Sequence, residues 1–598
     1  MDPRDNYWTR ARASGLSRRR FLYGSGVLAA GSAAVLAGCG DDDDDGGEAT
    51  PSTGGTQATS ASTGTPQAAS TTAAASAGKR GGTIITSKAS PDTGLDPAIT
   101  VTNPLHPAKA YSHILQYNLS ENKFYLDLAE KFEQADPTTM VFTLRPGLKF
   151  APQVANGRAL TAADVAFSYG RFPGTLKNFG SEVNGLQWNW MDSFETPDER
   201  TLKIKLKAPY ASAIPTMGSS AFAVVAKELV EANGGKLSDV MNAGAGPYVM
   251  TKRDSSGTRY ERNPNYYKHS PAVGTFVEDG PYIDVWDEVI IQDLAAVEAR
   301  FLAGDTHIYT QAVDKLKAEE FKSNKNVSVV KATFPGNLQM QLDNEKWAAH
   351  PKLREALSLS IDRNKYIQSI HLGEGQLGSP VGPIFDSVLT QAELKDLQKF
   401  DPARAKQLWA EGNGNTVFPN GLRTIAATFA PSTNVDFLKR EIEANLGVKV
   451  TVSPADLAAY VSIATARDKQ WEIFVASEFS LVTIPDYNAL TFYIPTGYGA
   501  IFGNQRLDSQ TKENADFAKT ALDKFNQQAQ ELDPAKRKQL LKDMQTYFLK
   551  EFRPALPMPV AQFQYAAHSN KLKNYPEKEF PYGNAGSGAY RVHNLSLA

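Results

Sequence analysis

Two separated strand–helix–strand units are the feature that most constrains what this chain can fold into. In the first unit, apolar alternation over residues 285–291 predicts a strand, and Asp293 is placed to cap a helix that runs through Phe301. That helix is expected to end at Gly304, and residues 308–309 begin another strand. Strands joined by a helical crossover run in the same direction, so this unit predicts a parallel pair.

The second unit lies at residues 448–476. Residues 448–452 alternate as a strand, Pro454 is placed to open a helix through Ala466, and residues 472–476 supply the next strand. Two parallel units so far apart in the chain predict an α/β fold with two lobes.

Further apolar patterns predict helices that pack into the cores of these lobes. Apolar residues that recur every four positions share one face of a helix, and an aspartate before a proline marks a helix start. The patterns are Leu353, Leu357 and Ile361 within residues 351–372; Asp401-Pro402 before Leu408; Phe517, Ala521 and Phe525; and Asp533-Pro534 before Leu540-Leu541.

A block over residues 117–239 is richer in strands. Residues 141–144 and 202–206 alternate between apolar and polar side chains, and Thr161 with Asp164 forms a helix-start box. We expect this block to be an insertion within the first lobe.

The first 38 residues have the pattern of a processing segment. Arg18-Arg19-Arg20 precedes a mildly apolar run, residues 21–38, which glycines interrupt. This start is similar to the twin-arginine export signal. The alternative is a single membrane-spanning helix, but a span needs about 20 mainly apolar residues.

The run ends at Leu36-Ala37-Gly38-Cys39, which resembles a bacterial lipobox and predicts lipidation of Cys39, the only cysteine of the chain. The alternative is a buried free cysteine, which the five aspartates at residues 41–45 disfavour. Residues 46–78 hold almost only small and polar side chains, which bury too little apolar area to fold, so residues 39–78 are expected to be a disordered linker. We therefore expect an extracytoplasmic protein anchored to the outer face of the cytoplasmic membrane.

Charge excludes one class of partner. The arginines of residues 1–38 and the acidic residues of 39–78 account for the formal net charge of −2, so the remaining chain is neutral. Binding to nucleic acid rests on clustered lysines and arginines that neutralise phosphates. We therefore expect no nucleic-acid partner.

The familiar signatures of catalysis are missing from the sequence. Gly373-Glu374-Gly375-Gln376-Leu377-Gly378 matches the dinucleotide-binding pattern, but it follows a predicted helix instead of a strand and is interpreted as a turn. The eight histidines show no metal-ligand spacing. No cofactor, metal site or enzyme activity is predicted, although neighbouring carboxylates leave a glycosidase open in principle.

Taken in order, short segments along residues 81–576 resemble the extracytoplasmic solute-binding proteins of ABC importers, in the peptide, opine and nickel-binding class known as family 5. These segments are Leu95-Asp96-Pro97, Leu128-Ala129-Glu130, residues 143–150, residues 160–165, Gly246-Pro247-Tyr248, residues 262–267, Ser360-Ile361-Asp362-Arg363 and residues 401–405. Most of them are interpreted as parts of the scaffold.

The resemblance implies a two-lobed clamp of the periplasmic-binding-protein type (type II, cluster C) with an additional inserted domain. It also implies closure on a small solute and delivery to the permease subunits in the membrane, and we expect a monomer. We place the lobe crossings near residues 334–336 and 557–559. The expected boundaries are 1–38 signal peptide, 39–78 linker, 79–116 first lobe, 117–239 inserted domain, 240–336 first lobe, 337–558 second lobe and 559–598 first lobe.

The resemblance also implies a ligand-facing segment. Asp486 and Tyr487 match an Asp-Tyr motif in which the aspartate of peptide binders pairs with the ligand's amino group, while Thr483 stands where those proteins often carry tryptophan. The alternative for Asp486 is a turn cap. The resulting hypothesis is a lipoprotein that binds an oligopeptide or similar small polar solute; a cell-surface hydrolase, such as a glycosidase or peptidase, and a solute sensor that uses the same clamp stay open.

Overall fold

The computed structural model describes most of the chain beyond residue 78. The described residues are 79–88, 94–98, 105–118, 123–171, 190–218, 222–266, 280–333, 336–347, 349–427, 432–455, 470–478, 484–485, 493–494, 512–575 and 595–598. Cys39 and the predicted signal and linker lie outside them.

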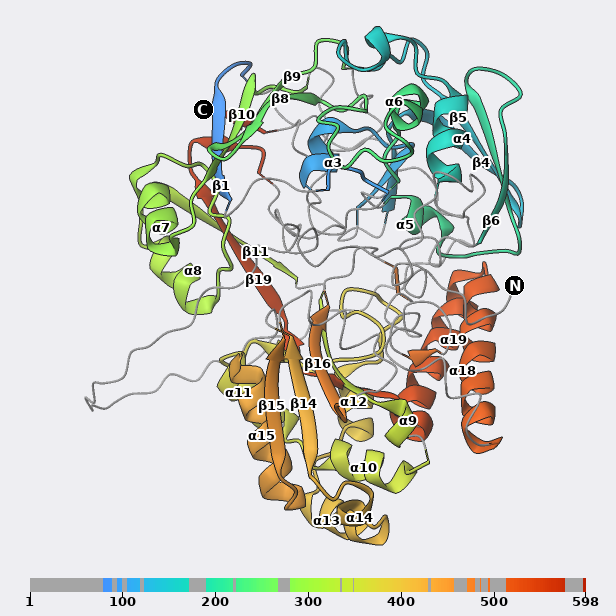
Figure 1. Cartoon of the computed structure of the whole chain (residues 1–598), viewed down its shortest axis with the longest axis vertical. Coiled ribbons are helices and arrows are strands. Elements are labelled where there is room, and N and C mark those ends of the chain that lie inside the picture. The colour runs from blue at the N-terminus through green and yellow to red at the C-terminus, as the bar shows by residue number, and fades with distance from the viewer. Residues whose placement is uncertain are drawn as a thin grey trace, which may run out of the picture.

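The first lobe, at the top of Figure 1, is built on a mixed sheet with the strand order β1-β10-β9-β8. Bridges from Thr86 to Ile308 and from Ile308 to His568 extend this sheet to the antiparallel pair β19 and β11. Its elements are β1 (Thr83–Lys88), α3 (Leu105–Ala110), β8 (Tyr248–Asp254), β9 (Gly257–Arg262), β10 (Val285–Ile290), α7 (Leu294–Ala303), α8 (Lys315–Lys322), β11 (Val327–Thr333), β19 (Phe563–Ser569), and the short pair β20 (Leu572–Lys573) and β21 (Ser596–Leu597).

The first strand–helix–strand prediction is confirmed. The Asp293 carboxylate accepts a hydrogen bond from the backbone N–H of Ala296 at the start of α7, and Gly304 ends the helix in the left-handed conformation. The two predicted strands are not direct neighbours, because β1 lies between β10 and Ile308 and is parallel to both. The sequence did not show that the amino-terminal strand occupies this place.

The second lobe, below the first in Figure 1, contains a five-stranded sheet with the order β15-β14-β16-β12-β17. Strands β15, β14 and β16 are parallel, and β12 runs antiparallel to both of its neighbours. The strands are β12 (Asn337–Leu342), β14 (Leu422–Ala427), β15 (Val450–Ala455), β16 (Ile473–Glu478) and β17 (Ala555–Met558).

The second predicted unit is correct in its strands and wrong at Pro454. This proline does not open a helix: it lies inside β15, opposite Ala426 of β14, and the rest of the helix predicted through Ala466 lies outside the described residues. A proline lacks the N–H that a central strand needs, but β15 is the edge strand of the sheet and tolerates one. The sequence analysis also missed β14, which lies between the two predicted strands.

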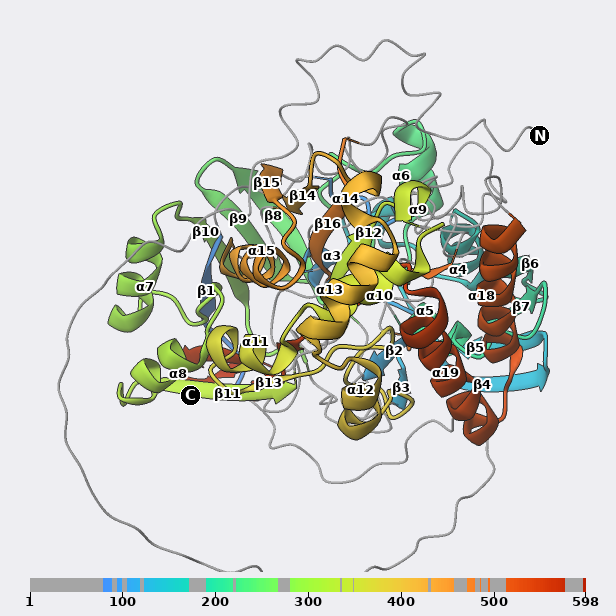
Figure 2. The same cartoon turned by 90° about the horizontal axis from the view of Figure 1, so that it is seen from below.

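Helices cover the second-lobe sheet, and α10, α13 and α15 lie side by side in the view from below (Figure 2). Leu353, Leu357 and Ile361 are fully buried, as their spacing predicted, but residues 351–372 form two helices instead of one. Asp362 breaks the run because its carboxylate caps the second helix through the N–H of Lys365. The helices are α9 (Asn344–Trp347), α10 (Pro351–Leu359), α11 (Arg363–Ile370), α12 (Gln391–Leu397), α13 (Pro402–Glu411), α14 (Gly414–Val417), α15 (Ser432–Leu446), α18 (Lys512–Gln530), α19 (Pro534–Tyr547) and a π-helical turn, Phe548–Phe552.

The predicted caps and stripes of the later helices are confirmed. The Asp401 carboxylate accepts from the N–H of Arg404, and that of Asp533 accepts from the N–H of Lys536. Ala521 and Phe525 of α18 are buried in one cluster with residues of α19, and Phe517 packs against it.

The strand-rich block carries an antiparallel sheet with the order β4-β5-β7-β6. The alternating residues 141–144 and 202–206 lie in β5 and β7, and Thr161 forms the predicted capping box with Asp164. The elements are β2 (Leu115–Asn118), β3 (Lys123–Leu126), β4 (Ala129–Asp136), β5 (Thr139–Leu144), α4 (Ala162–Gly170), β6 (Met191–Glu195), β7 (Thr201–Leu206), α5 (Ala213–Met217) and α6 (Lys227–Ala232). We call residues 117–239 the inserted block; its boundaries, like the others predicted, stay predictions.

Two strands run side by side from one lobe into the other. The pair β11 and β19 ends where Thr333 lies opposite Phe563, and the pair β12 and β17 begins where Leu338 lies opposite Met558. The predicted crossing at residues 557–559 therefore begins too early in the chain, because Pro557 and Met558 are still paired with β12. In the other crossing, Phe334 and Pro335 lie outside the described residues.

Candidate functional site

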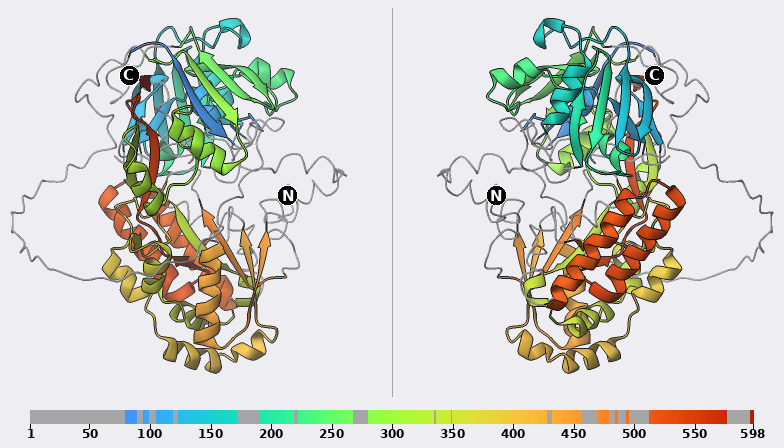
Figure 3. Two further views of the ribbon diagram at one scale, coloured as in Figure 1. Left: turned by 90° about the vertical axis from the view of Figure 1, so that its left-hand side faces the viewer. Right: turned by 90° about the vertical axis from the view of Figure 1, so that its right-hand side faces the viewer.

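The carboxyl ends of three parallel strands meet at one edge of the second-lobe sheet. Strands β14, β15 and β16 end there at Ala427, Ala455 and Glu478. This edge is the one nearest the first lobe, because Glu478 lies opposite Asn337, where the chain enters β12 from the first-lobe strand β11. Figure 3 shows the orange arrowheads directed toward the upper lobe. Open α/β sheets place their ligands at this edge, so it is the candidate site.

The predicted ligand-facing residues Thr483, Asp486 and Tyr487 follow β16 in the chain and lie outside the described residues, so their role stays a prediction. Two residues of the same segment are described. Ile484, only 4% exposed, packs in a core cluster formed chiefly by the inserted block, and Pro485 is half-buried. The chain that leaves the candidate edge therefore contacts the inserted block.

Strand β12, which begins at this edge, carries two buried glutamines that the sequence analysis missed. The Tyr493 hydroxyl donates a hydrogen bond of 2.8 Å to Oε1 of Gln339, which is fully buried. Gln341 is buried too, and its side-chain amide has no hydrogen-bond partner among the residues that the structure describes. The signal was present in the sequence, since polar residues alternate with Leu338, Met340 and Leu342 where a buried strand would be apolar on both faces.

The first lobe contains a buried cluster of charges behind the end of β1. The Lys109 ammonium is fully buried, bonds to Glu288, and lies 4.3 Å from the ring centre of Tyr260. Lys88 also reaches the Glu288 carboxylate, at 2.8 Å. Burial opposes ionisation of this carboxyl group, but Lys109 and Lys88 outweigh it and hold the pKa of Glu288 below its usual value.

His106 belongs to the same cluster and is neutral at physiological pH. Its Nδ1 lies 3.0 Å from the Tyr260 hydroxyl, and its ring packs edge-on against Tyr111. Burial, with Lys109 nearby, lowers the pKa of His106 to about 3. The cluster is a fixed, buried support for the first lobe.

The second lobe contacts the inserted block through its helices α18 and α19 (Figure 3). Arg537 of α19 donates a hydrogen bond of 2.5 Å to the Ser212 hydroxyl. The backbone N–H of Ala211 donates to the carbonyl of Ala529 across 2.8 Å. Tyr210 packs against the cores on both sides. These contacts join the two bodies at a place separate from the crossing strands.

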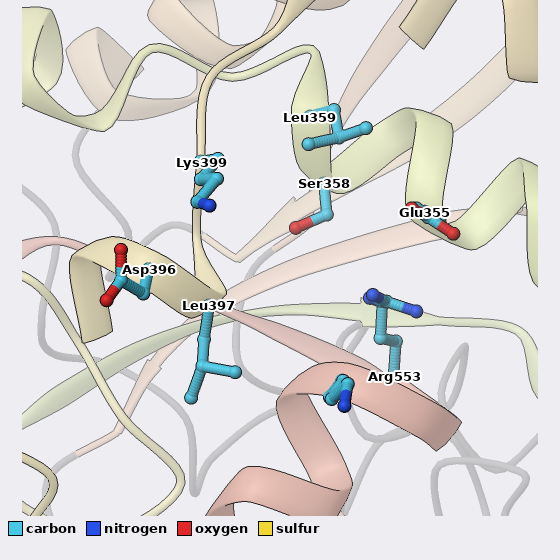
Figure 4. Close-up of a pocket in the computed structure, with 8 residues that line it drawn as sticks. Glu355, Ser358, Leu359, Asp396, Leu397, Lys399 and Arg553 are labelled. Atoms are coloured by element: carbon cyan, nitrogen blue, oxygen red, sulfur yellow. The ribbon is translucent and has the colours of Figure 1, made fainter. Parts of the chain in front are cut away.

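A surface hollow of about 190 Å³ lies elsewhere on the second lobe (Figure 4). Burial lowers the pKa of the Arg553 guanidinium in its wall. The hollow is not at the candidate edge, because no residue of β14, β15 or β16 lines it. Its lining residues are Glu355, Ser358, Leu359, Asp396, Leu397, Lys399, Lys550 and Arg553.

Two further observations concern only the described part of the chain. There, no three His, Cys, Asp or Glu side chains gather in a way that could hold a metal ion. None of its helices combines the length and the apolar character needed to cross a membrane. The glycine-rich segment at residues 373–378 follows helix α11, begins in a turn at Gly373 and continues through the short strand β13 (Gly375–Gln376), so it does not follow a strand and open a helix.

Comparison with known proteins gives consistent matches. The family model for "Bacterial extracellular solute-binding proteins, family 5 Middle" matches residues 123–500. The glutathione-binding protein GsiB of Salmonella typhimurium is 23% identical over 77% of this chain and 85% of its own length. The heme-binding protein A of Haemophilus influenzae is 23% identical over 57% of this chain, and the match spans 63% of that protein, less than two thirds.

Among solved structures, the periplasmic binding protein DppA from Helicobacter pylori, in complex with the peptide STSA, is similar with a TM-score of 0.69 and 18% identity. The match covers 87% of this chain and 98% of that protein. At this identity the likeness shows the fold, which is a two-lobed fold of mixed α/β structure.

Proposed function

The chain belongs to the bacterial extracellular solute-binding proteins of family 5, and we propose that it is the lipid-anchored substrate-binding component of an ABC importer. In this role it captures an oligopeptide or a similar small polar solute between its two lobes and delivers it to the permease subunits. The observation that carries the proposal is the family match over residues 123–500, which includes the sheet edge where β14, β15 and β16 end.

The cargo class is proposed from the relatives and from the chain's own segment after β16. Three proteins that are similar to this chain are described as binding glutathione, heme or a short peptide. Asp486 and Tyr487 are the proposed ligand contacts, with Asp486 as the charged partner of a ligand amine and Thr483 beside them. Peptides and peptide-like solutes present that amine, which supports an oligopeptide over a neutral sugar.

The anchor and the organisation of the chain are also proposals. We propose that the signal peptide ends at residue 38, that lipidated Cys39 holds the protein at the outer face of the cytoplasmic membrane, and that residues 39–78 serve as the tether. We propose that the inserted block and the second lobe, residues 337–558, are separate domains. We also propose that the protein acts as a monomer.

Native mass spectrometry of the purified protein tests this function, since a two-lobed clamp retains tightly bound solute. We expect a mass excess that disappears on unfolding and that matches a peptide or a similar small polar molecule. The same preparation is then incubated with peptide and oligosaccharide libraries. We expect it to bind some library members and so remove them from free solution, without producing cleavage products. Turnover of either library would instead support the hydrolase hypothesis.

A further inference from the structure

The glycine-rich turn after α11 lies along the second strand that passes between the lobes. Gly375 and Gln376, which form β13, pair with Ala561 and Val560 of β18 (Val560–Ala561). The backbone N–H of Gln562 donates a hydrogen bond of 2.8 Å to the carbonyl of residue 374. The turn therefore contacts the crossing strand along most of its length between the two sheets.

The glycines of this turn permit that close approach. A Cβ atom at Gly378 would lie 2.2 Å from the carbonyl oxygen of Met558, a distance that no side chain tolerates. Gly373 has a φ of +77°, in the left-handed region that favours glycine. The glycines that resemble a nucleotide-binding pattern thus have other physical causes here: a left-handed backbone at Gly373 and contact with the backbone of Met558 at Gly378.

Glu374 extends from this second-lobe turn to the first lobe. The Tyr565 hydroxyl of β19 donates a hydrogen bond of 2.5 Å to Oε2 of Glu374. Lys331 of β11 donates to Oε1 across 3.3 Å, and its ammonium also lies 3.6 Å from the ring centre of Phe563. The hydrogen bond from Tyr565 and the charge of Lys331 lower the pKa of Glu374, so this carboxylate is ionised at neutral pH.

The position of the turn matters because the crossing strand changes partners there. It is paired with β12 up to Met558, with β13 at Val560 and Ala561, and with β11 from Phe563 onward. A change in the angle between the lobes must be absorbed by the backbone of a few such crossing residues. Strand β13 pairs with these crossing residues and is joined to the first lobe through Glu374. It therefore restricts the change in the angle between the lobes.

We propose that residues 371–378 form a hinge clasp, in which Glu374 bonded to Tyr565 and Lys331 favours the lobe arrangement described here over one with the lobes farther apart. In this arrangement Ser212 and Arg537 are in contact between the inserted block and the second lobe. The inference rests on the two-lobed closure of the proposed function, but it concerns the lobes in the absence of solute. Loss of the clasp shifts the population toward separated lobes.

The test measures the distance between the lobes without any solute. Spin labels are placed at Glu199→Cys in the inserted block and Lys406→Cys on α13, both exposed positions, in the full chain with Cys39→Ser so that no other thiol reacts. Pulsed electron–electron double resonance then gives the distribution of distances between the two spin labels. Tyr565→Phe removes only the hydroxyl, and Glu374→Ala removes the carboxylate.

We expect each variant to raise the ratio of long to short distances by about threefold or more, since loss of a state-specific contact shifts a two-state population. The double variant should add little to either single change, because both residues act through one contact. Glu231→Ala is the matched control, since Glu231 is an exposed carboxylate that pairs with Lys227 on its own helix α6, in the inserted block; it should leave the distribution unchanged.

Thermal unfolding establishes that each variant is folded. If folded Tyr565→Phe and Glu374→Ala give the same distribution as the parent, the clasp does not set the lobe angle and the inference is overturned. That result would leave solute capture untouched, because mass spectrometry of retained solute tests it separately.

Discussion

Asp96 and Arg171 form an ion pair that is buried on both sides. Nη2 of Arg171 donates to Oδ2 of Asp96 across 2.7 Å, and the two side chains are 1% and 0% exposed. The same carboxylate accepts from the N–H groups of Ala98 and Leu237. Three segments of the chain therefore meet at one carboxylate, which explains why the Leu95-Asp96-Pro97 segment belongs to the scaffold.

Asp96→Asn should destabilise the protein strongly, because it leaves the Arg171 guanidinium buried without a counter-charge. Breaking a buried pair from one side costs about 3–5 kcal/mol of the free energy of unfolding. Urea unfolding followed by circular dichroism measures this loss. The double variant Asp96→Asn with Arg171→Met should recover part of it, and a single-variant loss below about 1 kcal/mol would contradict the assignment.

His106 predicts a dependence of stability on pH. In the unfolded chain this histidine binds a proton near pH 6.5, whereas in the folded chain its pKa is about 3, because of burial and the nearby charges of Lys109 and Lys88. Between these two values the unfolded state holds more protons, so stability falls as the pH is lowered, by at most about 1.4 kcal/mol per pH unit.

His106→Gln removes this titration and keeps a polar partner for Tyr260. The variant is expected to be less stable than the parent at pH 7.5, because packing is lost. That difference should shrink by about 2 kcal/mol between pH 6.5 and 4.5, as measured by urea unfolding at each pH. Parallel stability curves for the two proteins would show that His106 does not contribute to the acid sensitivity.

The sequence predicted those structural features that depend on residues close together in the chain, and it did not predict those that depend on the tertiary arrangement. The caps at Asp293, Asp401 and Asp533 were found because a carboxylate, its helix and its partner N–H lie within four residues. Pro454 was misassigned because its tolerance depends on β15 being an edge strand, which only the tertiary arrangement of the sheet determines. Asp362, interpreted as part of one long helix, begins a second.

The candidate site was less accessible to sequence reasoning for the same reason. The edge formed by β14, β15 and β16 requires the strand order, and β14 itself was missed. Glu374 and Tyr565 are 191 positions apart in the chain, so no local sequence pattern predicts the hydrogen bond between them. Thr483, Asp486 and Tyr487 came from family resemblance, and they lie outside the described residues.

Cys39→Ala is expected to release the protein from the membrane. The lipobox, the sole cysteine and the acidic stretch after it motivate this prediction. A single acyl chain binds membranes only marginally, so stable anchoring requires several chains on this residue. Fractionation of cells into membrane and soluble parts is the measurement. A variant that stays in the membrane fraction with its signal removed would contradict lipidation at Cys39.

Closure of the lobes around solute should make the protein more compact. The crossing strands near residues 559–562 and at Gly336 are the places where backbone rotation is expected. Small-angle X-ray scattering with and without the solute identified by mass spectrometry should give a smaller radius of gyration at saturation. An unchanged radius would mean that solute binds without lobe movement.

Asp486 is the residue whose substitution tests the cargo most directly. It follows β16, whose carboxyl end lies at the edge nearest the first lobe, and the resembling peptide binders use an aspartate at this place to hold the ligand's amino group. The competing interpretation is that Asp486 caps a turn before Tyr487, a common use of aspartate. The two differ in whether affinity depends on the charge.

Asp486→Asn keeps the shape and the turn-forming capacity of the side chain and removes its charge. A charge-assisted hydrogen bond contributes on the order of 1.5–3 kcal/mol, so we expect solute to bind about ten- to a hundredfold more weakly in calorimetric titration. Asp386→Asn is the matched control, because Asp386 is an exposed carboxylate of the second lobe that pairs with Lys538 on helix α19. A folded Asp486→Asn with unchanged affinity would remove this residue from the site, and with it the main argument that the solute carries an amine.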